Sequence, residues 1–233
     1  MFASLAALIT VAATAIPILL FASLTPPTSA FMIASRYADP ATGKPCVAVE
    51  HEWLDFESIS PDLGLAVIVA EDQRFFAHEG FDLNAINRAL TERSEGGRLR
   101  GASTISQQVA KNLFLWPSRS LIRKSLEAWF TVWIERIWSK RRILEVYLNI
   151  AQFGPCVFGA EAASRRYFDA DATALEPHQA ALLAAVLPSP RRLRAGDPGP
   201  YTRQRSAEIL ELMKWHQITD IGRQLDQLSE SNH

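Results

Sequence analysis

The chain has 233 residues, with 24 Lys and Arg against 25 Asp and Glu, so its formal net charge is -1 at pH 7. Hydrophobic residues make up 48% of the sequence, which suits one domain with a sizeable core and an apolar appendage. A near-neutral charge argues against a protein that coats nucleic acid, and we expect no nucleic-acid partner.

An uncharged apolar stretch begins the sequence, since no charged residue precedes Arg36. Residues 1–25 are long enough to span a bilayer, and we expect a transmembrane anchor, with a removed signal peptide as the alternative. Positive charges follow this stretch and none precedes it, so the positive-inside rule does not support a cytoplasmic N-terminus. Residues 26–60 mix Pro, Gly and charge, and we expect a neck that contains short helices.

The first candidate functional stretch follows the neck. Ser60 and Pro61 are typical of a helix start, and an apolar helix from there carries Glu71 at its far end. Phe75 and Phe76 come directly after, and a carboxylate among aromatic rings loses solvation. We therefore expect a raised pKa for this carboxyl, in the range useful for a general base. The alternative is an ordinary solvated acid at a helix end.

A second stretch places polar residues at the start of another helix. Thr104 and Gln107 fit a capping box, with Thr as the N-cap residue. The free N–H groups of a helix N-terminus can receive an anion, and Lys111 adds a full positive charge one to two turns along. Gln108 lies on the same expected face as Lys111.

A third cluster lies on a long predicted helix that begins at Ser120. Arg123 and Lys124 precede Glu127 by four and three residues, so all three side chains share one helix face. The alternative is a stabilising surface ion pair. Further helices are predicted over residues 139–151, 161–168, 176–186 and 201–215. We expect a catalytic domain over residues 61–216 and a polar, frayed tail over residues 217–233.

The two cysteines, Cys46 and Cys156, have no spacing typical of a metal site. A structural disulfide and two separate buried thiols both remain open, and a disulfide would suit a location outside the cytoplasm.

Four motifs in this order resemble those of the monofunctional biosynthetic peptidoglycan transglycosylases, whose domain also occurs in bifunctional penicillin-binding proteins. They are E-D-x-x-F-x-x-H-x-G at residues 71–80, G-x-S-T-x-x-Q-Q-x-x-K-N at residues 101–112, R-K-x-x-E at residues 123–127, and I-L-E-x-Y-L-N at residues 143–149. The resemblance runs from about Ile33 to Met213. It implies a mainly α-helical, lysozyme-like glycosyltransferase domain of two lobes, attached to the N-terminal transmembrane helix.

The resemblance also implies a reaction and its residues. The enzyme would polymerise lipid II into glycan strands by inverting transfer from a lipid-diphosphate-linked donor chain to the 4-hydroxyl of lipid II. Glu71 and Glu127 would be catalytic, Glu71 as the base. The residues that would bind sugar or diphosphate are Ser103, Gln108, Lys111, Asn112, Arg119, Arg123 and Lys124.

The location and the partners are expectations of the same kind. The family works at the bacterial cytoplasmic (inner) membrane, so we expect a single-pass protein whose catalytic domain faces the periplasm, with lipid II, the growing glycan chain and the membrane as partners. Partners in a cell-wall synthesis complex are compatible with the resemblance. The sequence indicates no required cofactor or metal ligand set, although the family resemblance is compatible with Mg²⁺. The alternatives are a lysozyme-like glycan-cleaving enzyme and a catalytically dead, membrane-anchored scaffold.

Overall fold

The computed structural model describes residues 14–94, 103–118, 120–217 and 220–230, and most of them are helical. The principal helices are α2 (Ala30–Ala38), α3 (Pro61–Glu71), α4 (Leu83–Ser94), α5 (Ile105–Phe114), α6 (Leu121–Ile137), α7 (Lys140–Ile150), α8 (Ala160–Phe168), α9 (Pro177–Val186), α10 (Pro200–Gln217) and α11 (Asp220–Glu230). Three short 3₁₀ helices are η1 (Phe56–Ser58), η2 (Phe75–Ala77) and η3 (Ala172–Ala174). The mainly α-helical class is therefore confirmed, as are the short helices of the neck.

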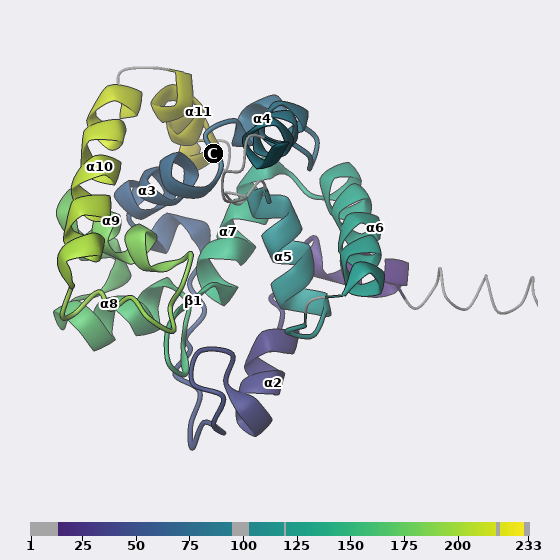
Figure 1. Ribbon diagram of the computed structural model, residues 1–233, viewed down its shortest axis with the longest axis horizontal. Coiled ribbons are helices and arrows are strands. Elements are labelled where there is room, and N and C mark those ends of the chain that lie inside the picture. The colour runs from purple at the N-terminus through teal and green to yellow at the C-terminus, as the bar shows by residue number, and fades with distance from the viewer. Residues whose placement is uncertain (1–13, 95–102, 119, 218–219, 231–233) are drawn as a thin grey trace, which may run out of the picture.

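The helices pack in two groups (Figure 1). In one group, α3 lies against α9, α10 and α11; in the other, α5 lies against α2, α6 and α7. Helix α3 is buried along its length, from Leu63 to Val69. A helix that is apolar on all sides is stable only inside a protein, so this sequence places α3 in the core. Its C-terminal end then carries Glu71 to the edge of the core.

The starts of α3 and α5 differ in their capping. Thr104 accepts a hydrogen bond from the backbone N–H of Gln107, and the Gln107 side chain accepts one from Thr104 N, so the predicted capping box is confirmed. Ser60 is the residue before α3 and Pro61 begins the helix, as predicted. The Ser60 hydroxyl makes no capping bond, however, and donates to the carbonyl of Leu175 at 3.0 Å. It joins the start of α3 to the segment before α9.

A small hairpin follows α7. Strand β1 (Gln152–Gly154) pairs antiparallel with β2 (Val157–Phe158), and Glu50 of the neck adds a parallel bridge to Val157. At the end of α7, Asn149 Oδ1 accepts a hydrogen bond from the backbone N–H of Leu54 at 2.8 Å, and Asn149 Nδ2 donates one to the carbonyl of Leu54 at 2.9 Å. Its side chain is fully buried, so Asn149 serves to fix the neck against α7.

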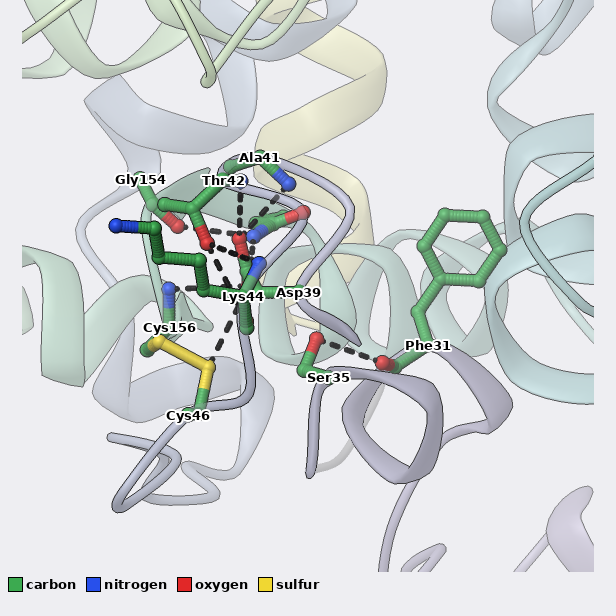
Figure 2. Close-up of a disulfide and its surroundings, with 10 residues drawn as sticks. Phe31, Ser35, Asp39, Ala41, Thr42, Lys44, Cys46, Gly154 and Cys156 are labelled. Carbon is green, nitrogen blue, oxygen red and sulfur yellow. Dashed lines mark hydrogen bonds between the residues drawn. A yellow bond between two sulfur atoms is a disulfide. The ribbon is translucent and has the colours of Figure 1, made fainter. Parts of the chain in front are cut away.

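A disulfide between Cys46 and Cys156 ties the loop after α2 to this hairpin (Figure 2). The two Cα atoms lie 5.8 Å apart although 110 residues separate them in sequence. Asp39 is buried beside the disulfide, and its carboxylate accepts bonds from the backbone N–H groups of Ala41, Thr42 and Cys156. The disulfide alternative for the two cysteines is therefore the correct one.

The described part of the N-terminal stretch is helical over residues 14–21 and packs on the rest of the protein. The indole N–H of Trp138 donates to the carbonyl of Ile18 at 2.8 Å, and Arg142 donates to Phe21 O and Leu24 O. Within the described residues, no helix combines the length and the apolar character needed to cross a membrane. Residues 1–13 of the expected anchor lie outside the described part of the chain.

The expectation of a frayed C-terminal tail is wrong. Residues Asp220–Glu230 form α11, which packs against α3. Ile221 and Leu225 are buried there, and the Leu225 methyl groups lie near Gly64 of α3, where a Cβ atom would be 3.5 Å away. The segment is polar overall, but its few apolar residues recur at helical spacing and form one buried face of α11.

Candidate active site

Glu71 is the last residue of α3, and its side chain is partly buried at the wall of a pocket of about 550 Å³. Burial raises the pKa of the Glu71 carboxyl, because the charged form loses solvation. Three groups oppose this rise: the hydrogen bond from Gln108 and the positive charges of Lys111 and Arg205. The expected direction of the pKa shift is thus confirmed.

Asp72, the next residue, contacts the loop after α3 and the start of α5. Its carboxylate lies 3.0 Å from His78 Nε2 and accepts a bond from the backbone N–H of Ile105 at 2.9 Å. The second contact joins the end of α3 to the N-terminus of α5, where a carboxylate is favoured by the free N–H groups. Asp72 therefore fixes the position of α5 relative to Glu71.

Gly80 allows the loop after α3 to approach α6. Its φ of +91° lies in the left-handed region, and a Cβ atom here would lie 2.7 Å from Thr131 Cγ2. Its carbonyl accepts a bond from the Thr104 hydroxyl at 2.7 Å. The glycine of the first motif is required by this close approach, and its role is to shape the backbone beside the pocket.

Helix α5 presents Gln108 and Lys111 toward Glu71. Gln108 Nε2 donates to Glu71 Oε2 at 2.8 Å, and Gln108 Oε1 accepts from the Tyr147 hydroxyl at 3.3 Å. Lys111 is coupled electrostatically to both Glu71 and Glu127, and burial lowers the pKa of its ammonium group. Among the described residues, this ammonium group has no hydrogen-bond acceptor, and the centroid of the Phe31 ring lies 5.6 Å from Lys111 Nζ.

The predicted cluster of Arg123, Lys124 and Glu127 is present on α6. Glu127 is buried and pairs through one oxygen with Arg123 Nη1 at 2.6 Å and through the other with Lys124 Nζ. Arg123 Nε also donates to the carbonyl of Ser118 at 2.7 Å. A buried carboxylate with two cations is not the solvated surface ion pair of the alternative interpretation, and its surplus positive charge suits an anionic ligand.

The remaining predicted residues differ in their placement. Ser103 lines the pocket together with Glu71, and its hydroxyl lies 3.4 Å from Lys124 Nζ, so it joins the start of α5 to α6. Asn112 is buried, and its Oδ1 has no partner among the described residues. Arg119 lies outside the described part of the chain. The structure thus brings Glu71, Ser103, Gln108 and Lys111 together around the junction of α3 and α5.

Three residues of the site have no assigned role in the sequence-based prediction. Arg88 of α4 and Arg205 of α10 line the pocket, and Arg205 Nη2 donates to the carbonyl of Ala70 at 3.3 Å. Tyr147 of α7 contacts Gln108 from the buried side. The arginines come from distant segments and carry no local signal. Tyr147 belongs to the fourth motif, but the sequence alone gives it no role in the site.

Among the described residues, the acidic side chains of this site do not form a group of three potential metal ligands. Both oxygens of Glu127 are bound by cations, and Glu71 binds Gln108. In the described residues, the one group of three potential ligand residues is Asp39, Cys46 and Cys156, and both its sulfur atoms belong to the disulfide. These donors do not fit a divalent metal.

Comparison with known proteins finds a matching family model and several similar proteins. The family model described as transglycosylase matches residues 41–214. The chain is 52% identical to a biosynthetic peptidoglycan transglycosylase of Xylella fastidiosa, over 82% of this chain and 79% of the relative. It is similar to proteins with the same description from Shewanella oneidensis (50% identical, 87% and 85% covered) and Pseudomonas aeruginosa (52% identical, 81% of each covered).

Proposed function

The chain belongs to the transglycosylase family, and from this premise we propose that it is a peptidoglycan glycosyltransferase that polymerises lipid II into glycan strands. The observation that supports it most is the partly buried carboxylate of Glu71 beside the partly buried ammonium group of Lys111. Lys111 also interacts electrostatically with Arg123, Lys124 and Glu127 of α6. The proposal assigns the two groups of helices to the two lobes that the family resemblance implies.

Glu71 is the general base of the proposed reaction. The 4-hydroxyl oxygen of lipid II forms a bond to the anomeric carbon of the donor chain, and its proton passes to the Glu71 carboxylate. The raised pKa of Glu71 brings its basicity closer to the range that is useful for this transfer. The hydrogen bond from Gln108 keeps one carboxylate oxygen oriented, so the other is free to accept the proton.

The basic residues stabilise the leaving diphosphate. As the new bond forms, the bond from the anomeric carbon to the diphosphate oxygen breaks, and the electron pair leaves with that oxygen. Lys111, Arg123 and Lys124 supply positive charge at the point where negative charge develops, and Arg119 is assigned to the same task. Glu127 positions the two cations of α6 through its two oxygens.

Binding of the sugars and the stereochemistry follow from the same arrangement. Ser103 and Asn112 would orient sugar or phosphate oxygens. Asn112 Oδ1 has no partner among the described residues and would accept a hydrogen bond from a bound hydroxyl group. A direct displacement without a covalent sugar intermediate inverts the anomeric carbon. Both oxygens of Glu127 are occupied by cations, which supports a positioning role for it and not a nucleophilic one.

We also propose that residues 1–25 form a single membrane span and that the catalytic domain lies in the periplasm, at the bacterial inner membrane. The disulfide supports a location outside the cytoplasm, because disulfides persist in oxidising compartments. A lipid-linked substrate is met more often by a membrane-tethered enzyme. The bonds from Trp138 to Ile18 and from Arg142 to Phe21 and Leu24 would hold the catalytic domain close to the membrane.

The proposal is tested by incubating the full chain in detergent with purified lipid II and separating the products by size. A polymer that lysozyme digests is the expected product. Conversion of finished glycan, with no reaction of lipid II, would identify a glycan-cleaving enzyme instead. No reaction with either substrate by a folded protein would identify a scaffold without catalytic activity.

A further inference from the structure

A chain of two hydrogen bonds leads from the buried core to Glu71. The Tyr147 hydroxyl donates to Gln108 Oε1 at 3.3 Å, and Gln108 Nε2 donates to Glu71 Oε2 at 2.8 Å. Tyr147 is 1% exposed, and its neighbours on α7, Val146 and Leu148, are buried and apolar. Among the described residues, Gln108 is the recorded partner of this hydroxyl.

The direction of these bonds is set by what each group can donate. The Gln108 carbonyl oxygen only accepts, so its contact with Tyr147 requires the hydroxyl to donate. With the carbonyl held there, the NH₂ end of the amide faces Glu71, and an NH₂ group favours the ionised carboxylate. The opposite amide orientation would place the carbonyl beside Glu71 and would suit only the protonated acid.

Tyr147 favours the first orientation over the second. If the amide turned round, its NH₂ group would donate to Tyr147, and the buried hydroxyl hydrogen would lose its acceptor. A buried donor without a partner is costly, whereas a spare acceptor lone pair on the same hydroxyl is tolerated more easily. Burial raises the pKa of Tyr147 well above its ordinary value, so the hydroxyl keeps its proton across the working pH range.

The other groups that act on Glu71 do not depend on this amide. Lys111 of α5 and Arg205 of α10 favour the ionised carboxylate by their charge, and Asp72 of α3 disfavours it. The direction of each of these effects on the pKa of Glu71 does not change when the side chain turns. Gln108 is uncharged, and its effect on the pKa of Glu71 reverses when its amide turns round.

We infer that Tyr147 is a positioning residue for the glycosyl transfer: it holds the Gln108 amide with its NH₂ group toward Glu71 and so keeps Glu71 ionised as the base. The inference rests on the proposed function of Glu71. The inference gives the hydroxyl of Tyr147, the tyrosine of the fourth motif, a task in the reaction. Burial in the core alone would not require this hydroxyl.

The test measures the pKa of Glu71 directly in Tyr147→Phe, which keeps the ring and removes the hydroxyl. The Glu71 carboxyl is followed by ¹³C NMR in full-length protein with labelled Glu, and its signal is assigned by its absence from Glu71→Gln. We expect its pKa to rise by roughly 0.5–1 unit, the size that one hydrogen bond supplies. The acid limb of the polymerisation pH profile should move up equally, with activity recovering at higher pH. An unshifted Glu71 pKa would overturn the inference.

A double variant shows whether Tyr147 acts through Gln108. In Gln108→Leu the amide is gone, so adding Tyr147→Phe should shift the Glu71 pKa no further. A further shift of the same size would refute the pathway. Replacing Tyr147 with 3-fluorotyrosine, a stronger donor that still fills the site, should move the Glu71 pKa down, and this variant decides the question if Tyr147→Phe fails to fold.

The controls separate this inference from the proposed function. Tyr167→Phe removes a half-buried hydroxyl that lies beside Gly154, away from the residues that perturb Glu71, and should leave the titration unchanged. If Glu71→Gln kept its polymerase activity, the proposed base would be wrong. The NMR titration would still decide whether Tyr147 controls the protonation of Glu71, because it does not depend on turnover.

Discussion

The disulfide between Cys46 and Cys156 should contribute a large part of the stability of the fold. It closes a loop of 110 residues, which includes α3 through α7. In the chain-entropy description, a loop of this length restricts the unfolded state by about 5 kcal/mol. For a protein of this size, that corresponds to a fall in Tm of about 10–20 °C on reduction.

Two double variants that differ only at position 156 test the backbone conformation of Cys156. Its φ of +60° lies in the left-handed region, which costs an ordinary residue free energy and costs glycine little. Both Cys46→Ser with Cys156→Ser and Cys46→Ser with Cys156→Gly remove the disulfide. The glycine variant should recover about 0.5–1 kcal/mol of the loss, after the larger entropy of unfolded glycine is counted.

The assay is urea unfolding followed by circular dichroism, with the parent protein measured in oxidised and reduced forms. The two serine substitutions should reproduce the midpoint of the reduced parent. Equal midpoints for oxidised and reduced parent would show that the crosslink does not restrict the unfolded chain, and the loop argument would be wrong. A glycine variant less stable than the serine variant would refute the argument from φ.

Three further predictions concern the active site and the N-terminus. Lys111→Met should lower polymerisation by about 10²-fold or more, because the charge on the leaving group is no longer stabilised. The Tm should stay equal or rise, because a partly buried and poorly solvated ammonium group is removed. A Tm that falls together with the activity would contradict this prediction. The pH profile of polymerisation should be bell-shaped. The midpoint of its acid limb should lie above about pH 4.3, because burial raises the pKa of Glu71, and the midpoint of its alkaline limb should lie below about pH 10.4, because burial lowers the pKa of Lys111. Midpoints at or outside these values would contradict the prediction. A chain that begins at Phe31 should keep its activity on lipid II in detergent and lose part of it on lipid II in vesicles; equal rates in vesicles would show that the N-terminal stretch does not aid the reaction.

Local signals predicted much of the site. The capping box at Thr104 and Gln107 depends on two residues three apart, and the Arg123–Lys124–Glu127 cluster depends on helical spacing, so both were visible in the sequence. The sequence also indicated that Glu71 would end an apolar helix and lose solvation.

Contacts between distant segments could not be predicted in the same way. The approach of Arg205 to Glu71 and the donation from Tyr147 to Gln108 depend on how α10 and α7 pack. Likewise, pairing of Cys46 with Cys156 is a matter of distance across 110 residues, which spacing alone does not reveal. The buried face of α11 is hard to predict because three apolar residues, Ile221, Leu225 and Leu228, in a polar segment give a weak signal until a partner helix is known.

The central claim, that Glu71 is the base of lipid II polymerisation, is tested most directly by the rate of Glu71→Gln. Because burial raises the pKa of Glu71 in the folded protein, its ionisation costs stability as pH rises above about 4.3, and the neutral variant should be at least as stable as the parent at pH 7. A loss of activity would therefore not reflect unfolding. We predict that polymerisation falls by about 10²–10⁴-fold. A rate within about threefold of the parent would contradict the assignment of the base, since removing a general base typically costs far more than that.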